Sequence, residues 1–320
     1  MSRIIKVKKH IYIYSPSGAV RDKAAFKRGV RHLELMGHDV EIDSDTLSSA
    51  HRFAGSDETR IHGIHRTAAS GADIALMSRG GYGITRIMQG IRYKSLQKSI
   101  EHGMEWVGHS DFTALQMALL AKTGSTTWAG PHVCGDFGVA SPPKGQIRPD
   151  PDEIMLDCFS DLVLQRGEGT GWRQNPLADG YLTERHVRGA TLWGGNLTVL
   201  TSLLGTPYFP QIKAGVLFLE DIGEHPYRIE RMLDQLLYCG ILKDQKAIVL
   251  GQFTDFKLTP HDKGFKLQSV INRLRTQLKI PVIDNLPFGH VPTKVMLPVG
   301  AKVDLVLQGR DVLILWGDDV

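Results

Sequence analysis

Short apolar runs alternate with segments of helical spacing over the first 125 residues of the chain. The runs end in loops, which is typical of buried strands, and they read IIKVKKHIYIYSPSG, HDVEID, ADIALMSRGGYG and MEWVG. Segments such as 57–69 and 111–124 carry apolar residues three and four positions apart, as helices do. This alternation predicts a parallel α/β sheet for the first half of the chain.

The pattern weakens between about 137 and 175. Four prolines occur in SPPKGQIRPDPDE, and the Gly-rich polar stretch RGEGTGWRQNP follows. We interpret this segment as a linker with a surface excursion. The expected organisation is an N-terminal α/β domain over 1–140, a linker over 141–180 and a C-terminal domain over 181–320.

The C-terminal part of the chain is richer in expected strands. GATLWGGNLTVLTSLLGT predicts a glycine turn followed by a helix, and strands in AGVLFLEDIGE and KAIVLGQF alternate with helices in HPYRIERMLDQLLYCG and FKLQSVINRLRTQL. A short strand with a turn is expected in PVIDNLPFGH. The final stretch VMLPVGAKVDLVLQGRDVLILW predicts β-hairpins with turns at Gly300 and Gly309.

Three turns of the first half, PSG, RGGYG and GHSD, follow the carboxyl ends of expected strands. Ligands of open α/β sheets bind at that edge, so the three turns favour a site there. Ser110, in GHSD, stands between a strand and a helix. It could be the N-cap of that helix, or a nucleophile exposed on a tight strand-to-helix turn.

A serine nucleophile needs a base and an orienting acid, and sequence order places no limit on either. Glu220 ends the apolar strand GVLFLE, and His290 follows the turn in VIDNLPFGH. Taken singly, these residues are also typical of a turn cap and a surface loop. Among thirteen histidines, His290 is the first candidate for the base and His132 the second. His109 adjoins Ser110, but neighbouring side chains on a sharp turn diverge.

Acyl transfer also requires donors for the developing oxyanion. The amide of Asp111 is one natural choice, and RGGYG supplies a second, because Gly80, Gly81 and Gly83 permit close backbone approach and positive φ. No GxxxxGK[ST] or GxGxxG pattern follows the first strand, which argues against a phosphate loop. Arg79 could pair with a substrate carboxylate or be a structural charge.

Composition narrows the function classes. The chain has 320 residues, 42% hydrophobic and 22% charged, as expected for a globular core, and its formal charge of +4 is scattered, which predicts no nucleic-acid partner. Three distant cysteines suggest neither disulfides nor zinc, and there is no HExxH motif, so no metal or cofactor is expected. No secretory signal and no long apolar stretch are found, so we expect a cytoplasmic protein without a membrane partner.

Five separated blocks of the chain resemble, in order, those of the LD-carboxypeptidases, serine peptidases that include the microcin-immunity hydrolases. The blocks are SRGGYGITRIM, WVGHSDFTALQMAL, LWGGNLTVL, FLEDIGEHPYRIERML and FGHVPTKVMLPVGAKVDL. The resemblance spans nearly the whole chain, except for about 142–172. It implies a triad in which Ser110 is the nucleophile, Glu220 the acid and His290 the base.

The same resemblance implies further roles and a fold. The backbone amides of Gly81 and Asp111 would form the oxyanion hole. Asn196, in the block LWGGNLTVL, would be a substrate-binding residue of the cleft or the N-cap of the following helix. Arg79 is the residue that we consider, from its position beside the glycine turn, as a further substrate-binding candidate. The fold would be a Rossmann-like parallel sheet layer followed by a mixed, strand-rich, barrel-like domain, and the protein a homodimer. The implied reaction removes D-Ala from the L-diamino acid of a murein tetrapeptide during cell-wall recycling.

Two other functions stay open from the sequence. A microcin-immunity-type enzyme would hydrolyse a peptidyl-nucleotide amide and would stack the base on an aromatic platform, for which Trp172, in the loop region 167–176, is the candidate. A non-catalytic small-molecule binding module would use the same cleft. It would bind its ligand without forming an acyl-enzyme.

Overall fold

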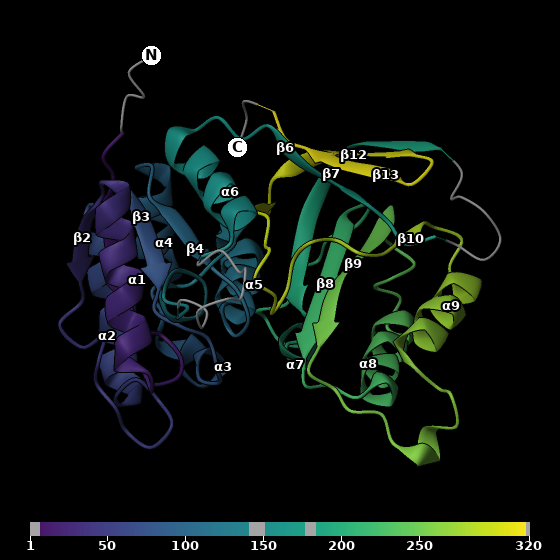
Figure 1. Ribbon diagram of the computed structural model, residues 1–320, viewed down its shortest axis with the longest axis horizontal. Helices are drawn as coiled ribbons and strands as arrows, with labels where there is room; N and C mark the ends of the chain where they lie inside the picture. The colour runs from purple at the N-terminus through teal and green to yellow at the C-terminus, as the bar shows by residue number, and fades with distance from the viewer. Residues whose placement is uncertain (1–6, 141–150, 177–183, 318–320) are drawn as a thin grey trace, which may run out of the picture. The chain divides into compact units, whose positions relative to one another are not determined.

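The computed structural model describes residues 7–140, 151–176 and 184–317 of the chain. They divide into two compact units, one comprising residues up to 167 together with 292–297, and the other comprising 168–291 and the residues from 298 onward. Figure 1 shows the elements of each unit coloured along the chain. Within the described ranges, no helix is long and apolar enough to cross a membrane.

The first unit is built on a six-stranded sheet, rich in parallel pairs, with the strand order β11-β5-β4-β3-β1-β2. Strands β1 to β5 pair in parallel with their neighbours. They comprise β1 (His10–Tyr14), β2 (Asp39–Ile42), β3 (Ile74–Met77), β4 (Glu105–Gly108) and β5 (Thr127–Ala129), and the edge strand is β11 (Leu297–Val299). The turns PSG, RGGYG and GHSD follow β1, β3 and β4, so they lie at one edge of this sheet, as predicted.

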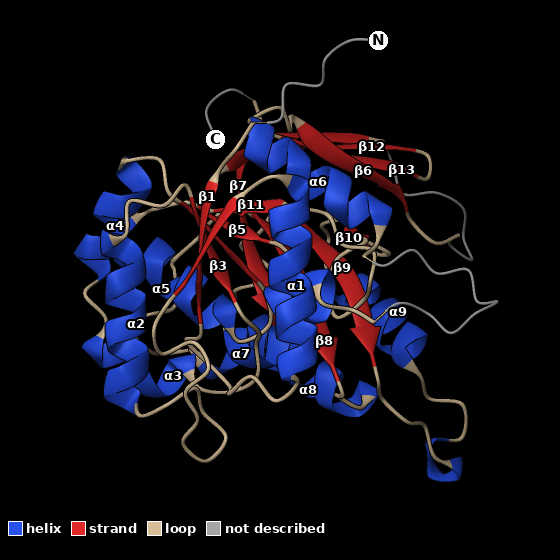
Figure 2. Ribbon diagram, turned by 60° about the vertical axis from the view of Figure 1, so that its left-hand side comes forward, coloured by secondary structure: helices blue, strands red, loops and turns tan. Residues whose placement is uncertain are grey.

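Helices cover this sheet because their apolar faces need burial. Figure 2 shows the strands between α4 on one side and α1 on the other. The buried helix α5 is apolar all round, which places it in the core rather than on the surface. The helices are α1 (Lys23–Met36), α2 (Asp57–Ala69), α3 (Ile84–Ile87), α4 (Tyr93–Glu101), α5 (Phe112–Thr123) and α6 (Glu153–Leu164).

The second unit contains a seven-stranded mixed sheet with the order β10-β9-β8-β7-β12-β13-β6. Strands β7 to β10 run parallel, whereas β7, β12, β13 and β6 pair antiparallel. The strands are β6 (Gly169–Arg173), β7 (Arg185–Asn196), β8 (Val216–Ile222), β9 (Ala247–Thr254), β10 (Val282–Ile283), β12 (Lys302–Gln308) and β13 (Asp311–Leu315). The helices are α7 (Leu197–Ser202), α8 (Pro226–Tyr238) and α9 (Leu267–Gln277).

The fold class expected from the sequence is confirmed, and two local predictions are corrected. GATLWGGN does not form a turn: it belongs to β7, which pairs with β8 on one side and β12 on the other. A Cβ on Gly194 would lie 2.0 Å from the carbonyl oxygen of Phe218. The glycine therefore allows β7 to approach β8 closely. The segment expected to be a linker contains α6 and β6, and the proline-rich excursion at 141–150 lies outside the described residues.

A buried carboxylate fixes the loop after β2. Asp43 accepts hydrogen bonds from the Tyr12 hydroxyl at 2.8 Å, from Arg66 Nε at 2.7 Å and from Arg66 Nη2 at 2.8 Å. Burial would raise the pKa of Asp43, but these bonds and that from the Asp45 amide outweigh it and hold the pKa below its usual value. The ionised form is therefore favoured by folding.

We expect Asp43→Asn to lower the free energy of unfolding by about 2 kcal/mol at neutral pH, because the amide cannot accept all of these donors. A depressed folded-state pKa gives stability above the unfolded-state pKa that is lost as the pH falls through the folded-state value. The difference between variant and wild type should therefore shrink toward about pH 3. Urea unfolding at both pH values measures it, and a constant difference would contradict the prediction.

Candidate active site

Ser110 occupies a strained strand-to-helix turn. It follows Gly108 of β4 by two residues, and its φ of 64° lies in the left-handed region that non-glycine residues rarely adopt. Its side chain is half-buried, whereas His109 and Asp111 on either side are buried. The N-cap of α5 is Asp111, so the helix-cap interpretation of Ser110 does not describe this turn. A strained strand-to-helix turn of this kind, called the elbow below, is typical of a serine nucleophile, and that role for Ser110 remains a prediction.

The glycine loop after β3 lies directly against this serine. A Cβ on Gly80 would be 2.8 Å from Ser110 Cβ and 2.9 Å from Ser110 Oγ, so a larger residue at position 80 would displace the hydroxyl. Gly81 has a φ of 112°. The loop thus brings its backbone close to the serine oxygen, which is where the donors of an oxyanion hole must lie. The assignment of that hole to the amides of Gly81 and Asp111 remains a prediction.

The carboxylate of Asp111 joins the three turns at this edge of the sheet. Its Oδ2 accepts a hydrogen bond from the Ser17 hydroxyl at 2.6 Å and another from the Ile84 amide at 2.9 Å. The residue is only 2% exposed. Burial raises its pKa, while the bonds from Ser17, Ile84 and Gly83 oppose that shift. Asp111 therefore has a structural role that its expected part in the oxyanion hole did not suggest.

We expect Asp111→Asn to destabilise the protein by about 1–3 kcal/mol, because its amide nitrogen must face a backbone or hydroxyl donor at one of these contacts. Denaturant unfolding measures the change. The matched control is Asp311→Asn, since Asp311 is exposed and pairs with the exposed Arg173 at 2.8 Å. An exposed pair contributes little, so the control should stay within about 0.5 kcal/mol of wild type. Equal effects would contradict the prediction.

Glu220 and His290 form a hydrogen-bonded pair in the second unit. His290 Nδ1 lies 2.8 Å from Glu220 Oε2, although 70 positions separate the two residues in the chain. Glu220 is completely buried, whereas the imidazole is partly exposed. A buried carboxylate accepts from Nδ1–H and leaves Nε2 as the proton acceptor, which is the tautomer that a general base requires.

Irregular pairing in β8 places two consecutive carboxylates. The register with β9 shifts between Leu219 and Asp221, and both Glu220 and Asp221 are buried. Such bulges commonly re-aim side chains next to active sites. Asp221 turns to Thr198, whose amide and hydroxyl donate to it at 2.8 and 2.7 Å. Burial raises the pKa of Asp221, and the hydrogen bonds from Thr198 oppose this increase. The negative charge of Glu220 adds to it.

Asn196 supports the acid of this pair. Its Nδ2 donates to Glu220 Oε1 at 3.2 Å and to Asp221 Oδ1 at 3.0 Å, while its Oδ1 accepts from the Val199 amide as the N-cap of α7. The sequence had suggested a cleft residue or a cap. The structure shows that Asn196 is the cap. It also shows the contact with Glu220, which no local sequence pattern predicts.

A glycine lets the chain turn beside the acid. Gly289 has a φ of 139°, and a Cβ on it would lie 2.9 Å from the carbonyl oxygen of Gln252 and 3.3 Å from Glu220 Oε2. Any side chain at this position would therefore push on the carboxylate. The glycine before His290 is required both by conformation and by space.

A polar cluster beside the elbow was not expected from the sequence. His109, His132 and Asp136 place one potential ligand atom each within 4.8 Å of one another. The two imidazoles stack with centroids 4.6 Å apart, and Lys294 Nζ lies 2.7 Å from Asp136 Oδ1. Because the buried ammonium already supplies positive charge to the carboxylate, we interpret the cluster as structural rather than metal-binding.

The second candidate for the base belongs to this cluster. His132 Nδ1 accepts the Gly135 amide at 3.0 Å, as the cap of the 133–137 turn. His109 Nδ1 contacts the carbonyl oxygen of Gly130 at 2.8 Å. Of the three candidate histidines, His290 is therefore the one that the structure pairs with a buried glutamate.

Trp172 does not lie in a loop. It belongs to β6, opposite Val312 of β13, and it is only 9% exposed. Its indole nitrogen donates to the carbonyl oxygen of Asp284 at 2.9 Å. The ring is part of the packed interior of the second unit rather than an open stacking platform.

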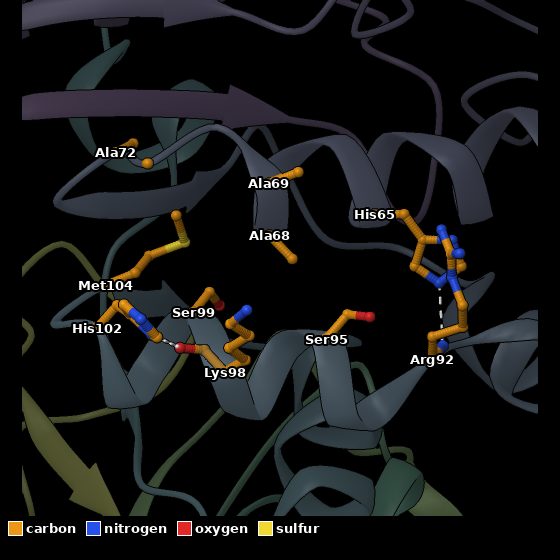
Figure 3. A pocket seen from close by; sticks show the side chains of 11 residues that line it. His65, Ala68, Ala69, Ala72, Arg92, Ser95, Lys98, Ser99, His102 and Met104 are labelled. Carbon is orange, nitrogen blue, oxygen red and sulfur yellow. Dashed lines mark hydrogen bonds between the residues drawn. The ribbon is translucent and has the colours of Figure 1, made fainter.

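A surface cavity of about 450 Å³ lies between α2 and α4 of the first unit. Figure 3 shows His65 and Ala68 of α2 facing Ser95 and Lys98 of α4. Its far end is lined by residues that directly precede β3 and β4, so it opens at the amino edge of the sheet, opposite to Ser110. None of the candidate site residues lines it.

Comparison with known proteins places the chain in a family. Residues 11–130 match the model of the LD-carboxypeptidase N-terminal domain, and residues 189–305 match that of the C-terminal domain. A probable murein peptide carboxypeptidase of Bacillus subtilis is 30% identical, over 89% of this chain and 85% of its own. The structure of MccF bound to glutamyl sulfamoyl guanosine, at 21% identity and a TM-score of 0.80 over 97% of each chain, shares the fold.

The solved structure of a muramoyltetrapeptide carboxypeptidase from Oxalobacter formigenes is more similar in sequence. It is 38% identical to this chain, covers 96% of it and 99% of its own length, and superposes with a TM-score of 0.83. The match to the N-terminal model includes Ser110, and the match to the C-terminal model includes Glu220 and His290. The chain is a member of the LD-carboxypeptidase family.

Proposed function

We propose that this protein is a serine carboxypeptidase that hydrolyses the bond between the L-diamino acid and D-Ala in murein tetrapeptides. The observation that carries the proposal is the 2.8 Å contact between His290 Nδ1 and the buried Glu220, which prepares an imidazole to act as a base. The strained, partly exposed Ser110 is the corresponding nucleophile. Family membership and relatives named for murein peptides support the substrate class.

The proposed reaction proceeds in two halves. His290 Nε2 takes the proton of Ser110 as the hydroxyl oxygen attacks the scissile carbonyl carbon, and Glu220 stabilises the imidazolium. The amides of Gly81 and Asp111 donate to the oxyanion. Collapse breaks the C–N bond, and the imidazolium gives its proton to the leaving amine of D-Ala. Water, activated by the same imidazole, then hydrolyses the acyl-serine ester.

These steps use only side chains and backbone of this chain, so the proposal includes neither metal nor cofactor. We place the reaction in the cytoplasm, where recycled tetrapeptides would be the substrate, and we propose that the enzyme acts as a homodimer. Asn196 enters the mechanism through its bond to Glu220, which fixes the carboxylate that holds His290.

The deciding experiment is incubation with a purified muramoyl tetrapeptide, followed by mass spectrometry. Loss of one alanine residue from the tetrapeptide is the expected result. A matched tetrapeptide that ends in L-Ala should remain intact, because the mechanism is proposed for a D-configured leaving residue. Equal cleavage of both, or cleavage of neither, would overturn the substrate assignment.

The microcin-immunity alternative shares the chemistry but needs a site for a nucleobase. The sequence offered Trp172 as the stacking platform, and that ring is buried in β6. This observation favours the tetrapeptide substrate. Release of a sulfamoyl nucleoside from an aminoacyl sulfamoyl adenosine would support the alternative. Ligand binding with no labelling by a serine-reactive fluorophosphonate would instead support a non-catalytic binding module.

A further inference from the structure

Arg79 packs across the turn that follows β1. Its Nη1 donates to the carbonyl oxygen of Ala19 at 3.0 Å, and the amide of Ala19 in turn bonds to the carbonyl oxygen of Arg52 at 3.0 Å. A Cβ on Gly18 would lie 2.8 Å from Arg79 Nη1. The absence of a side chain at position 18 thus provides space for the guanidinium, which is half-buried.

Positive charge gathers around this guanidinium, and no carboxylate in residues 7–140, 151–176 and 184–317 forms an ion pair with it. Burial first, and then the charges of Arg21 and Arg52, lower the pKa of Arg79. Within the part of the chain that the structure describes, the acidic group that acts on Arg79 is the thiol of Cys134. Burial raises the pKa of this thiol to about 12, so it is neutral at pH 7. Among the described residues, Arg21, Arg52 and Arg79 form no ion pair with an acidic side chain.

Other arginines of the same unit show the usual arrangement. The buried Arg60 bonds Asp57 at 2.6 Å, and Arg66 pairs with Asp43 at 2.7 Å. Grouping three like charges, one of them half-buried, costs free energy that these pairs avoid. Such an uncompensated arrangement is typical of a site that receives its counter-charge from a ligand.

The position of Arg79 relates this charge to the reaction. Arg79 directly precedes Gly80, whose backbone lies against Ser110 Oγ. An enzyme that removes one residue from the C-terminus cleaves the last peptide bond. In that substrate the carbon of the terminal carboxylate lies only about 4 Å from the scissile carbonyl carbon. A group that recognises the carboxylate must therefore lie close to the nucleophile, on the backbone that approaches it.

We propose that Arg79, with Arg21 and Arg52 around it, is the carboxylate-recognition site that restricts this enzyme to peptides with a free C-terminal carboxylate. This inference rests on the proposed function, which it deepens by naming the substrate group that is read. Arg79 supplies a planar pair of N–H donors for the two carboxylate oxygens. Arg21 and Arg52 add long-range attraction, and none of the three takes part in proton transfer.

The test compares two substrates that differ in one group, a tetrapeptide with a free terminal carboxylate and the same tetrapeptide with a terminal carboxamide. We expect wild-type enzyme to prefer the acid by about 100-fold in kcat/KM, the range of a charge-assisted bidentate contact. Arg79→Ala should lose about 100-fold on the acid, chiefly through KM, and change by less than about threefold on the amide. Added guanidinium should restore part of the activity on the acid.

Two controls separate recognition from a loss of fold. Arg92→Ala removes an exposed arginine that lines the distant cavity between α2 and α4, and it should behave as wild type on both substrates. Labelling of Ser110 by a fluorophosphonate should be as fast in Arg79→Ala as in wild type. Arg21→Ala and Arg52→Ala should each have a smaller effect and lower kcat/KM on the acid by about fivefold. This loss should decrease at high salt, because salt screens long-range attraction.

The outcomes distinguish the two levels of the proposal. Equal losses on acid and amide in Arg79→Ala, or a wild-type enzyme that cleaves both equally well, would overturn the carboxylate site and leave the peptidase assignment standing. Wild-type enzyme that is labelled by the fluorophosphonate yet cleaves neither substrate would overturn the proposed function, and the recognition site with it.

Discussion

Ser110→Ala is expected to lower turnover of a murein tetrapeptide by about 10⁴-fold or more, since members of a catalytic triad act as a unit. The reason is chemical: the variant keeps the elbow, the loop at Gly80 and the Glu220–His290 pair, but it lacks the oxygen that attacks the carbonyl. Mass spectrometry of the product over a long incubation measures the residual rate. Substrate binding should persist, and the fluorophosphonate should no longer label the protein.

The matched control for this variant is Ser95→Ala. Ser95 is a serine of α4 that lines the cavity between α2 and α4, away from the elbow. It should retain wild-type turnover and labelling. Turnover within tenfold of wild type in Ser110→Ala would exclude a covalent serine mechanism for this protein.

Glu220→Gln is expected to lower kcat by about 10³–10⁴-fold through the wrong imidazole tautomer. Asn196 Nδ2 donates to one oxygen of Glu220, so the glutamine would keep its own oxygen there and turn its amide nitrogen to His290. Two donors cannot face each other, so His290 Nδ1 would lose its proton and Nε2 would carry it. The base could then no longer accept the proton of Ser110.

Steady-state kinetics of the variant should show a fall in kcat with little change in KM, because Glu220 does not touch the substrate in the proposed mechanism. The neighbouring Asp221→Asn provides a matched substitution, since Asp221 is also buried but bonds Thr198 instead of a histidine. It should lower kcat by less than about tenfold. Equal losses in the two variants would show that the buried carboxylates act on folding rather than on His290.

Local periodicity predicted much of the first unit. The spacing over 57–69 gave α2 with the bounds that the structure has, and the strand ends before PSG, RGGYG and GHSD are where the sequence placed them. Helix α4 was missed although Tyr93, Leu96 and Ile100 stand at helical spacing, because its nine residues are shorter than the window over which such a period is recognised. Helix α6 was missed because the prolines before it and the glycines after it suggested a loop throughout.

The second unit shows why glycine is an ambiguous signal. In LWGGN the two glycines suggested a turn, yet their positive φ angles of 126° and 132° occur inside β7. The missing side chain of Gly194 allows close approach to β8, which depends on pairing between distant segments. Propensity alone cannot show such pairing.

Long-range contacts set the limit for the site. The strand-end positions of Ser110, Glu220 and His290 made them candidates, but the Glu220–His290 bond joins residues 70 positions apart. The Lys294–Asp136 pair spans 158 positions and had no sequence signal at all. The side chain of Asp111 gave no signal either, because its partners Ser17 and Ile84 lie on other turns of the sheet edge.

The positive φ at Ser110 sets heat resistance and chemistry against each other. Glycine is the residue that this backbone conformation favours, so a library screened only for survival at high temperature should enrich glycine at position 110 and silence the protein. Any effort to raise the thermal stability of this fold would have to keep Ser110 unchanged and introduce stabilising substitutions at other positions.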